Sequence, residues 1–220
     1  MAEAQSPPGR PAAVLAIITI AWVAVAAVAT HIVSTQYDFV RDYISDYAVG
    51  PYGWIYSSAF IAAFVGCVAL AVALWQAVPT SALSRIGAIL LVIVGVGYAI
   101  DFFYPTDILA PGEPPQTMTG KIHLAAAFLS WVLFVIAAPM ISARLRRDPR
   151  FSPWRGALTL FGWLALPLLL ILVAIVVAMT PVGGLAEKVF ILDRNVWSLI
   201  LALAILRLPS AAARLNGASR

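Results

Sequence analysis

Charged residues are scarce in this chain. Of its 220 residues only 11% are Asp, Glu, Lys or Arg, whereas 62% are hydrophobic, and the mean hydropathy is +0.94. A soluble domain carries about 25% charged residues, which cover its surface. No polar stretch of this chain is long enough to fold outside a membrane. The composition therefore argues against a soluble globular protein and predicts a single all-α membrane domain over residues 1–220.

Several kinds of functional motif are also missing. The single cysteine, Cys67, lies in an apolar run, so no disulfide can form within the chain. The sequence has no H-E-x-x-H or H-x-x-H pattern, and we predict no bound metal. It also lacks G-x-S-x-G, Walker and dinucleotide-binding glycine patterns, so we predict no cofactor. The net charge of +4 comes from basic residues that flank apolar runs, which argues against a nucleic-acid partner.

Long apolar runs make up most of the chain. A helix needs roughly 20 apolar residues to cross a bilayer. Six runs are predicted to do so, over residues 11–33, 54–78, 86–103, 122–143, 157–179 and 189–206. Without its polar turn at Asp193 and Arg194, the sixth run would keep only residues 196–206, too few to span at ~1.5 Å each. Its charges must therefore enter the membrane.

The connecting loops alternate in charge and thereby set the predicted topology. One side holds ten basic residues and two acids, and the other holds four basic residues and eight acids. Because Lys and Arg in short loops concentrate on the cytoplasmic side, we expect both termini in the cytoplasm. The first run is too long for a signal-peptide core and is interpreted as a retained helix. The expected location is a cell membrane, which the chain crosses several times.

The first outer loop is expected to contain a short interfacial helix over residues 37–47. Spaced as in a helix, its apolar and aromatic residues fall on one face and its charged residues on another, which is typical of an amphipathic helix at a membrane surface. The apolar face consists of Tyr37, Val40, Tyr43, Ile44 and Tyr47. The alternative interpretation is a solvated loop with internal Asp–Arg pairs.

Two charges lie deep in the predicted helices. Asp101 is about 24 Å along its helix from Arg85, and Arg194 is roughly 20 Å along its helix from Arg207. Because unpaired charges at this depth are costly, we expect Asp101 or a neighbouring acid to pair with Arg194. Asp193 is the competing acid, although it points about 100° away from Arg194 on the same helix.

Two histidines lie at helix ends on the same side as these acids. His31 ends the first run and His123 begins the fourth. A histidine beside a carboxylate can act as a general base, although a single interfacial histidine is more often a polar cap.

Four short motifs carry a resemblance to a known family. These are Ser45-Asp-Tyr-Ala-Val-Gly-Pro-Tyr-Gly-Trp54, Tyr104-Pro-Thr-Asp107, Gly120-Lys-Ile-His123 and Gly184-Leu-Ala-Glu-Lys188. In this pattern the chain resembles, over residues 12 to 206, the DUF998 family of six-helix bacterial membrane proteins. Lys188 stands where that family has arginine. A lysine ammonium lacks the planar fork of arginine, which puts any bidentate contact with a carboxylate or phosphate in doubt. The family's name records an unknown function, so the resemblance implies only an architecture, a location in the bacterial inner membrane and candidate positions.

All four motifs fall at the outer ends of helices, where their polar residues are expected to line one pocket. The candidates for catalysis are His123, Asp107, Ser45 and Asp101, and those for binding are Asp46, Thr106, Glu187, Lys188, Asp193, Arg194 and His31. At this depth the ligand would be a lipid or another amphipathic molecule.

Three functions remain open. One is a lipid-binding or accessory protein with membrane lipids and a partner membrane protein as its partners. Another is a lipid hydrolase in which His123 is the base, Asp107 or Asp101 orients it, and Ser45 or Thr106 is the nucleophile. A small transporter ranks third, because no broken helix and no charge near the bilayer centre are predicted.

Overall fold

The computed structural model describes residues 9–78, 81–109 and 113–209, and this part of the chain is helical with no strand. The long helices are α1 (Arg10–Val33), α2 (Gly53–Ala77), α3 (Ala82–Phe103), α4 (Met118–Leu145), α5 (Arg155–Val177) and α6 (Gly183–Leu206). Two short 3-10 helices, η1 (Asp46–Ala48) and η2 (Pro149–Phe151), lie between them. All six long helices have the length and composition to cross a membrane. The predicted all-α class and the six spans are therefore confirmed, and the chain is a multi-pass membrane protein.

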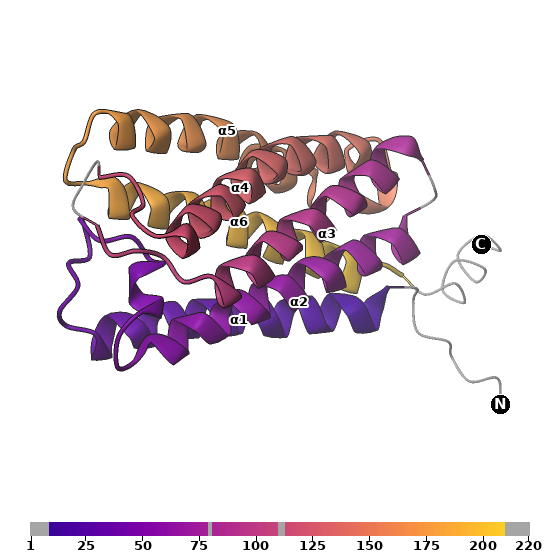
Figure 1. Cartoon of the computed structure of the whole chain (residues 1–220). Helices are drawn as coiled ribbons and strands as arrows, with labels where there is room; N and C mark the ends of the chain where they lie inside the picture. The colour runs from indigo at the N-terminus through magenta and orange to yellow at the C-terminus, as the bar shows by residue number, and fades with distance from the viewer. Residues whose placement is uncertain (1–8, 79–80, 110–112, 210–220) are drawn as a thin grey trace, which may run out of the picture.

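Helices that are neighbours in sequence are also neighbours in space. Each long helix packs on the next, and α6 returns to contact α1 and α2 (Figure 1). Trp197 of α6 is fully buried and packs edge-on against Phe134 of α4, with ring centroids 5.4 Å apart. Its Nε1 donates to Ser142 Oγ at 3.0 Å, and that hydroxyl donates to the Leu158 carbonyl of α5 at 2.8 Å. These contacts join α4, α5 and α6 in the interior.

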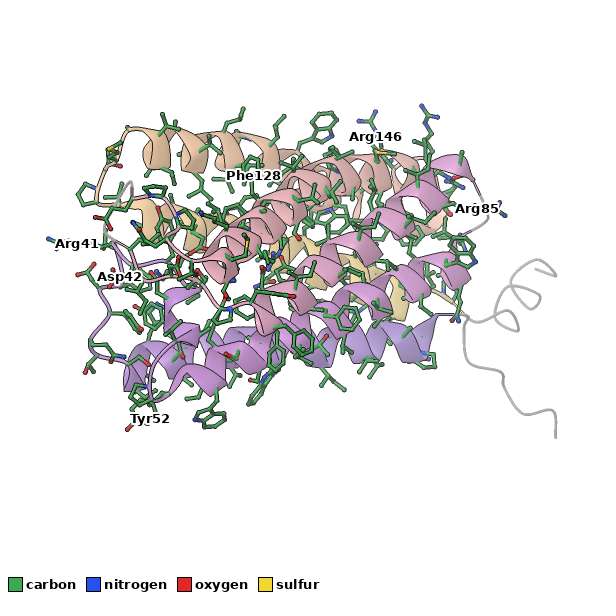
Figure 2. All side chains as sticks on the ribbon, viewed as in Figure 1. Arg41, Asp42, Tyr52, Arg85, Phe128 and Arg146 are labelled. Carbon is green, nitrogen blue, oxygen red and sulfur yellow. The ribbon has the colours of Figure 1, made fainter. Side chains whose placement is uncertain are left out.

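The two ends of the bundle differ in charge. The connections from α1 to α2, α3 to α4 and α5 to α6 lie at one end, which we call the acidic end. The other end carries the start of α1, the end of α6 and most of the arginines, and we call it the arginine end. Arg41 and Asp42 lie at the acidic end, whereas Arg85 and Arg146 lie at the arginine end (Figure 2).

Helices α3 and α4 begin four residues earlier than their apolar runs, because polar residues cap them. Ser81 and Ser84 form a reciprocal capping box at the start of α3, and the Thr117 hydroxyl accepts from Gly120 N at 2.9 Å at the start of α4. Helix α6 begins at Gly183, six residues before the predicted start. Arg194 is consequently the twelfth of its 24 residues. One charge thus lies halfway along a helix that is long enough to span the membrane.

The loop over residues 34–52 does not form the predicted interfacial helix. It folds as successive turns with η1 as its only helical element. Aspartate side chains take up the backbone N–H groups that a helix would need: Asp38 Oδ1 accepts from Val40 N at 2.8 Å and Arg41 N at 2.9 Å. Asp46 Oδ2 likewise accepts from Tyr43 N at 2.8 Å. Such local side-chain bonds compete with helix formation, and apolar spacing alone does not reveal them.

Candidate functional site

A small polar cavity lies inside the bundle just below the acidic end. Its volume is about 30 Å³, enough for one or two water molecules. Helices α2, α3, α4 and α6 and the 34–52 loop all contribute to its wall. Five of the sequence-predicted candidates meet there: Ser45, Asp101, His123, Glu187 and Arg194. The clustering expected from the four motifs is therefore present in part.

His123 is fixed in orientation by its Nδ1 atom. This atom lies 2.9 Å from the Tyr104 carbonyl oxygen, which only accepts hydrogen bonds, so Nδ1 carries the proton in the neutral ring. Asp101 Oδ1 lies 3.6 Å from the same nitrogen, just beyond hydrogen-bond distance. No described residue forms a hydrogen bond with Nε2. Nε2 is thus left as a free acceptor on a residue that lines the cavity.

Arg194 does not form the predicted ion pair with Asp101. Its guanidinium carbon lies 4.5 Å from the centre of the Tyr98 ring, one helical turn below Asp101 on α3. No Lys or Arg nitrogen lies within 4.0 Å of an Asp101 oxygen among the described residues. The two side chains nevertheless line the same cavity, and Nη1 of Arg194 is buried without a hydrogen-bond partner. The Tyr98 ring therefore lies against Arg194 where we predicted a carboxylate.

Glu187 ties the 34–52 loop to α6. Its Oε2 accepts from the backbone N–H of Ile44 at 2.6 Å, and both residues are almost fully buried. The backbone N–H groups of Gly184 and Leu185 donate to the carbonyl oxygens of Arg41 and Val40, at 3.2 and 2.9 Å. The first turn of α6 therefore holds the loop directly against the cavity.

Lys188 and His31 lie outside the cavity, beneath the same loop. Lys188 Nζ donates to the Asp42 carbonyl at 2.5 Å and lies over the rings of Phe39 and Tyr47. The His31 ring packs against the same two rings, and its Nδ1 lies 2.6 Å from the Ala27 carbonyl. The two histidines of the chain therefore lie in different surroundings, and His31 helps to pack the loop.

Asp46 is buried in the loop beside these groups. Burial raises the pKa of its carboxyl to about 7, because the charged form loses its hydration. The bond from Tyr43 N and the nearby Lys188 act in the opposite direction, and Asp42 adds to the increase. The carboxyl of Asp46 therefore titrates near neutral pH.

Asp107 and Thr106 belong to a separate structural element, the connection that precedes α4. Asp107 Oδ1 accepts from the Thr117 hydroxyl at 2.6 Å, and its Oδ2 accepts from Gln116 N and Thr117 N, both at 2.8 Å. The Thr117 hydroxyl bond, the largest influence, lowers the pKa of Asp107. Thr106 Oγ1 donates to the Asp107 carbonyl at 3.2 Å. Of the two carboxylates proposed to orient His123, only Asp101 contacts it.

Asp193 is buried, and neither of its carboxylate oxygens has a hydrogen-bond partner in the described part of the chain. It does not line the cavity. Its position between Phe190 and Trp197 on α6 places it on the face that packs against α4, because those two rings contact Trp131 and Phe134. Asp193 is thus on a different face from Arg194.

Two tyrosines of the site were not predicted. Tyr56 and Tyr98 are buried and line the cavity, and the Tyr98 hydroxyl has no partner among the described residues. Tyr98 precedes Asp101 by one helical turn, a spacing that could have indicated it. Among the described residues, no group of three or more His, Cys, Asp or Glu is arranged to hold a metal ion.

Comparison with known proteins identifies the family. Neither the curated proteins nor the solved structures gave a match. The family described as "Protein of unknown function (DUF998)" matches residues 11–204, which include every residue that lines the cavity. The chain therefore belongs to the DUF998 family of membrane proteins.

Proposed function

We propose that the cavity at the acidic end is the catalytic site of a membrane-embedded hydrolase that cleaves an ester of a lipid or another amphipathic molecule. The observation that carries the proposal is the orientation of His123. Its Nδ1 is held by the Tyr104 carbonyl and faces Asp101, while Nε2 is free on a cavity that Ser45 also lines. These are the groups of a serine, histidine and aspartate triad, except that the Tyr104 carbonyl, rather than Asp101, accepts from Nδ1.

Each group has a defined role in the reaction. Ser45 Oγ attacks the ester carbonyl carbon while His123 Nε2 accepts the hydroxyl proton. Asp101 stabilises the resulting imidazolium, and Arg194, the one Lys or Arg side chain on the described cavity wall, stabilises the oxyanion. The proton then passes to the departing alcohol, leaving an acyl-Ser45 ester. Water, deprotonated by the same histidine, hydrolyses that ester and restores the hydroxyl.

An amphipathic substrate suits the surroundings of these groups. The cavity lies within helices that cross the membrane, and Phe60, Trp131 and Ile191 give it an apolar wall. A volume of about 30 Å³ admits only the reacting group, so the segment at Ile44 and Ser45 must move for a substrate to enter. The distribution of arginines supports an acidic end that faces away from the cytoplasm, with both termini inside a bacterial cell.

A lipid-binding or accessory role is the second candidate. The bonds from Ile44 to Glu187 and from Lys188 to Asp42 hold the loop closed over the cavity, which suits a structural role. However, no Lys or Arg among the described residues forms an ion pair with Asp101 or Glu187, as such a role would lead us to expect. A transporter is less well supported, because all six long helices are continuous.

The proposal is tested by ester turnover of the purified protein in detergent, with 4-methylumbelliferyl heptanoate and a fluorogenic short-chain phospholipid as probes. We expect His123→Gln and Ser45→Ala each to lose at least about 100-fold in rate. Thr106→Ala is the matched control, since its hydroxyl bonds only its own loop, and it should keep the wild-type rate. Melting temperatures must be similar for all four proteins. Wild-type protein without turnover, or variants as active as the wild type, would favour the non-catalytic role.

A further inference from the structure

A groove of a different character lies at the arginine end, between the end of α4 and the start of α5. It consists of two cavities of about 590 and 210 Å³ that share Arg146 and Thr159. Arg155 and Leu160 line the larger cavity, and Arg147 and Trp163 line the smaller one. The groove is at the opposite end of the bundle from the acidic-end cavity, so what it binds does not depend on the function proposed there.

The three arginines of this groove have no partner among the described residues, unlike their neighbours at the same end. No described residue accepts a hydrogen bond from, or forms an ion pair with, the side chains of Arg146, Arg147 and Arg155, and all three are exposed. In contrast, Arg144 donates to Ser81 Oγ and Arg150 forms a 2.6 Å ion pair with Asp148.

Asp148 is the one acid described at the arginine end, and its pair with Arg150 is already made. The positive charge of the groove is therefore not compensated by the described part of the protein.

Further donors belong to residues that line the groove. The hydroxyl oxygen of Thr159 is buried without a hydrogen-bond partner among the described residues. The residue before α5, Trp154, provides no side-chain cap, so the first N–H groups of α5 have no such partner. A phosphate group accepts hydrogen bonds from arginine, hydroxyl and helix N-terminal N–H donors alike.

The other wall of the groove is apolar and exposed. Leu160 and Trp163 are 60% and 56% exposed, and they follow Arg155 on α5 by about one and two turns. On a helix that crosses a membrane, this places them against lipid tails, directly below the arginines. A soluble anion would use the arginines but gain nothing from Leu160 and Trp163, whereas a phospholipid uses both.

We propose that this groove binds the phosphate head group of an anionic phospholipid, with Arg146, Arg147 and Arg155 around the phosphate and Leu160 and Trp163 along the acyl chains. Basic pockets between membrane-spanning helices are known to hold anionic head groups.

The test compares lipid retention by native mass spectrometry, using protein taken from vesicles of phosphatidylcholine with phosphatidylglycerol. Arg146→Gln with Arg155→Gln removes two charges from the groove. Arg10→Gln with Arg85→Gln removes two charges from the same end but outside it; Arg85 stacks on Trp75 at 5.6 Å. Each groove arginine should contribute about five-fold, or ~1 kcal/mol, to the preference for phosphatidylglycerol. We therefore expect the groove variant to lose about 25-fold and the control less than two-fold.

Three results would overturn the proposal. The groove variant could keep the wild-type preference, or both variants could lose it equally, which would mean that only the overall charge matters. Glycerol 3-phosphate, added at millimolar concentration, could displace the bound lipid as effectively as added phosphatidylglycerol. That result would identify a site for free phosphate esters. If the double variant does not fold, Arg146→Gln and Arg155→Gln are each compared with Arg85→Gln, and the expected loss is about five-fold.

Discussion

The carboxylate of Glu187 accepts a hydrogen bond from the backbone N–H of Ile44 at 2.6 Å, across 143 positions of sequence. This bond joins the first turns of α6 to the loop between α1 and α2, and both residues line the cavity at the acidic end. Whatever the substrate, the shape of the cavity depends on this contact, because Ser45 directly follows Ile44.

Removing the carboxylate should therefore destabilise the protein. Glu187→Ala leaves the buried Ile44 N–H without an acceptor, and we expect it to lower the free energy of unfolding by about 1–3 kcal/mol. Glu187→Gln keeps an acceptor oxygen and should lose less than half as much. Thermal unfolding in detergent measures both. Equal losses for the two variants would show that the charge, rather than the bond to Ile44, matters.

Asp46 should make stability depend on pH. Its pKa in the fold is about 7, above the ordinary value of 3.8, so the folded protein binds this proton more tightly than the unfolded chain does. The stability it contributes is fully present below pH 4 and is lost as the pH rises to about 7. Relative to the wild type, Asp46→Asn should gain up to about 4 kcal/mol between pH 4 and pH 8, at ~1.36 kcal/mol per pKa unit. Melting curves that stay parallel over this range would contradict the burial of a titrating carboxyl.

Two glycines of α5 should respond in opposite ways to the same substitution. A Cβ at Gly162 would lie 2.8 Å from Ser142 Oγ and 3.2 Å from the Ala138 carbonyl oxygen, so Gly162→Ala should cost about 1–3 kcal/mol. A Cβ at Gly156 meets nothing within 4 Å, and Gly156→Ala should be neutral or slightly stabilising. Thermal unfolding of the two variants gives the comparison. A neutral Gly162→Ala would mean that α4 and α5 are farther apart than described.

The predicted topology can be tested by cysteine labelling in a background with Cys67 replaced by alanine. A cysteine at Glu113, near the acidic end, should react with a membrane-impermeant maleimide in intact cells. A cysteine at Ser152, an exposed residue between α4 and α5, should react only after permeabilisation. Ser152 is preferable to its neighbour Asp148, which is buried and paired with Arg150. The reverse pattern would invert the orientation of the bundle.

Sequence reasoning identified the parts of this fold that depend on local composition. The six spans follow from apolar runs. Of the candidates that line the cavity, Ser45, His123 and Glu187 belong to motifs at helix ends, whereas Asp101 and Arg194 follow from their depth in the predicted helices. It failed where a contact depends on side-chain direction or depth. Arg194 meets the Tyr98 ring instead of the Asp101 carboxylate, although Arg194 and Asp101 line the same cavity.

The loop before α2 failed for a related reason. Three aspartates bond to nearby backbone N–H groups and replace the helix that the apolar spacing predicts. Asp107 likewise appears in a family motif, yet its oxygens are taken up by Gln116 and Thr117. A motif therefore indicated that a position has a role, without separating a structural role from a catalytic one.

The most direct test of the central claim is covalent labelling with a fluorophosphonate, which reacts with serine hydroxyls activated by a general base. The purified protein should gain one phosphonyl group, and peptide mapping should locate it on Ser45. His123→Gln should reduce the labelling rate at least about 100-fold, while Thr106→Ala should leave it unchanged. Labelling that is absent from the wild type, or that lies on another serine, or that is as fast in His123→Gln, would contradict a catalytic role for this cavity.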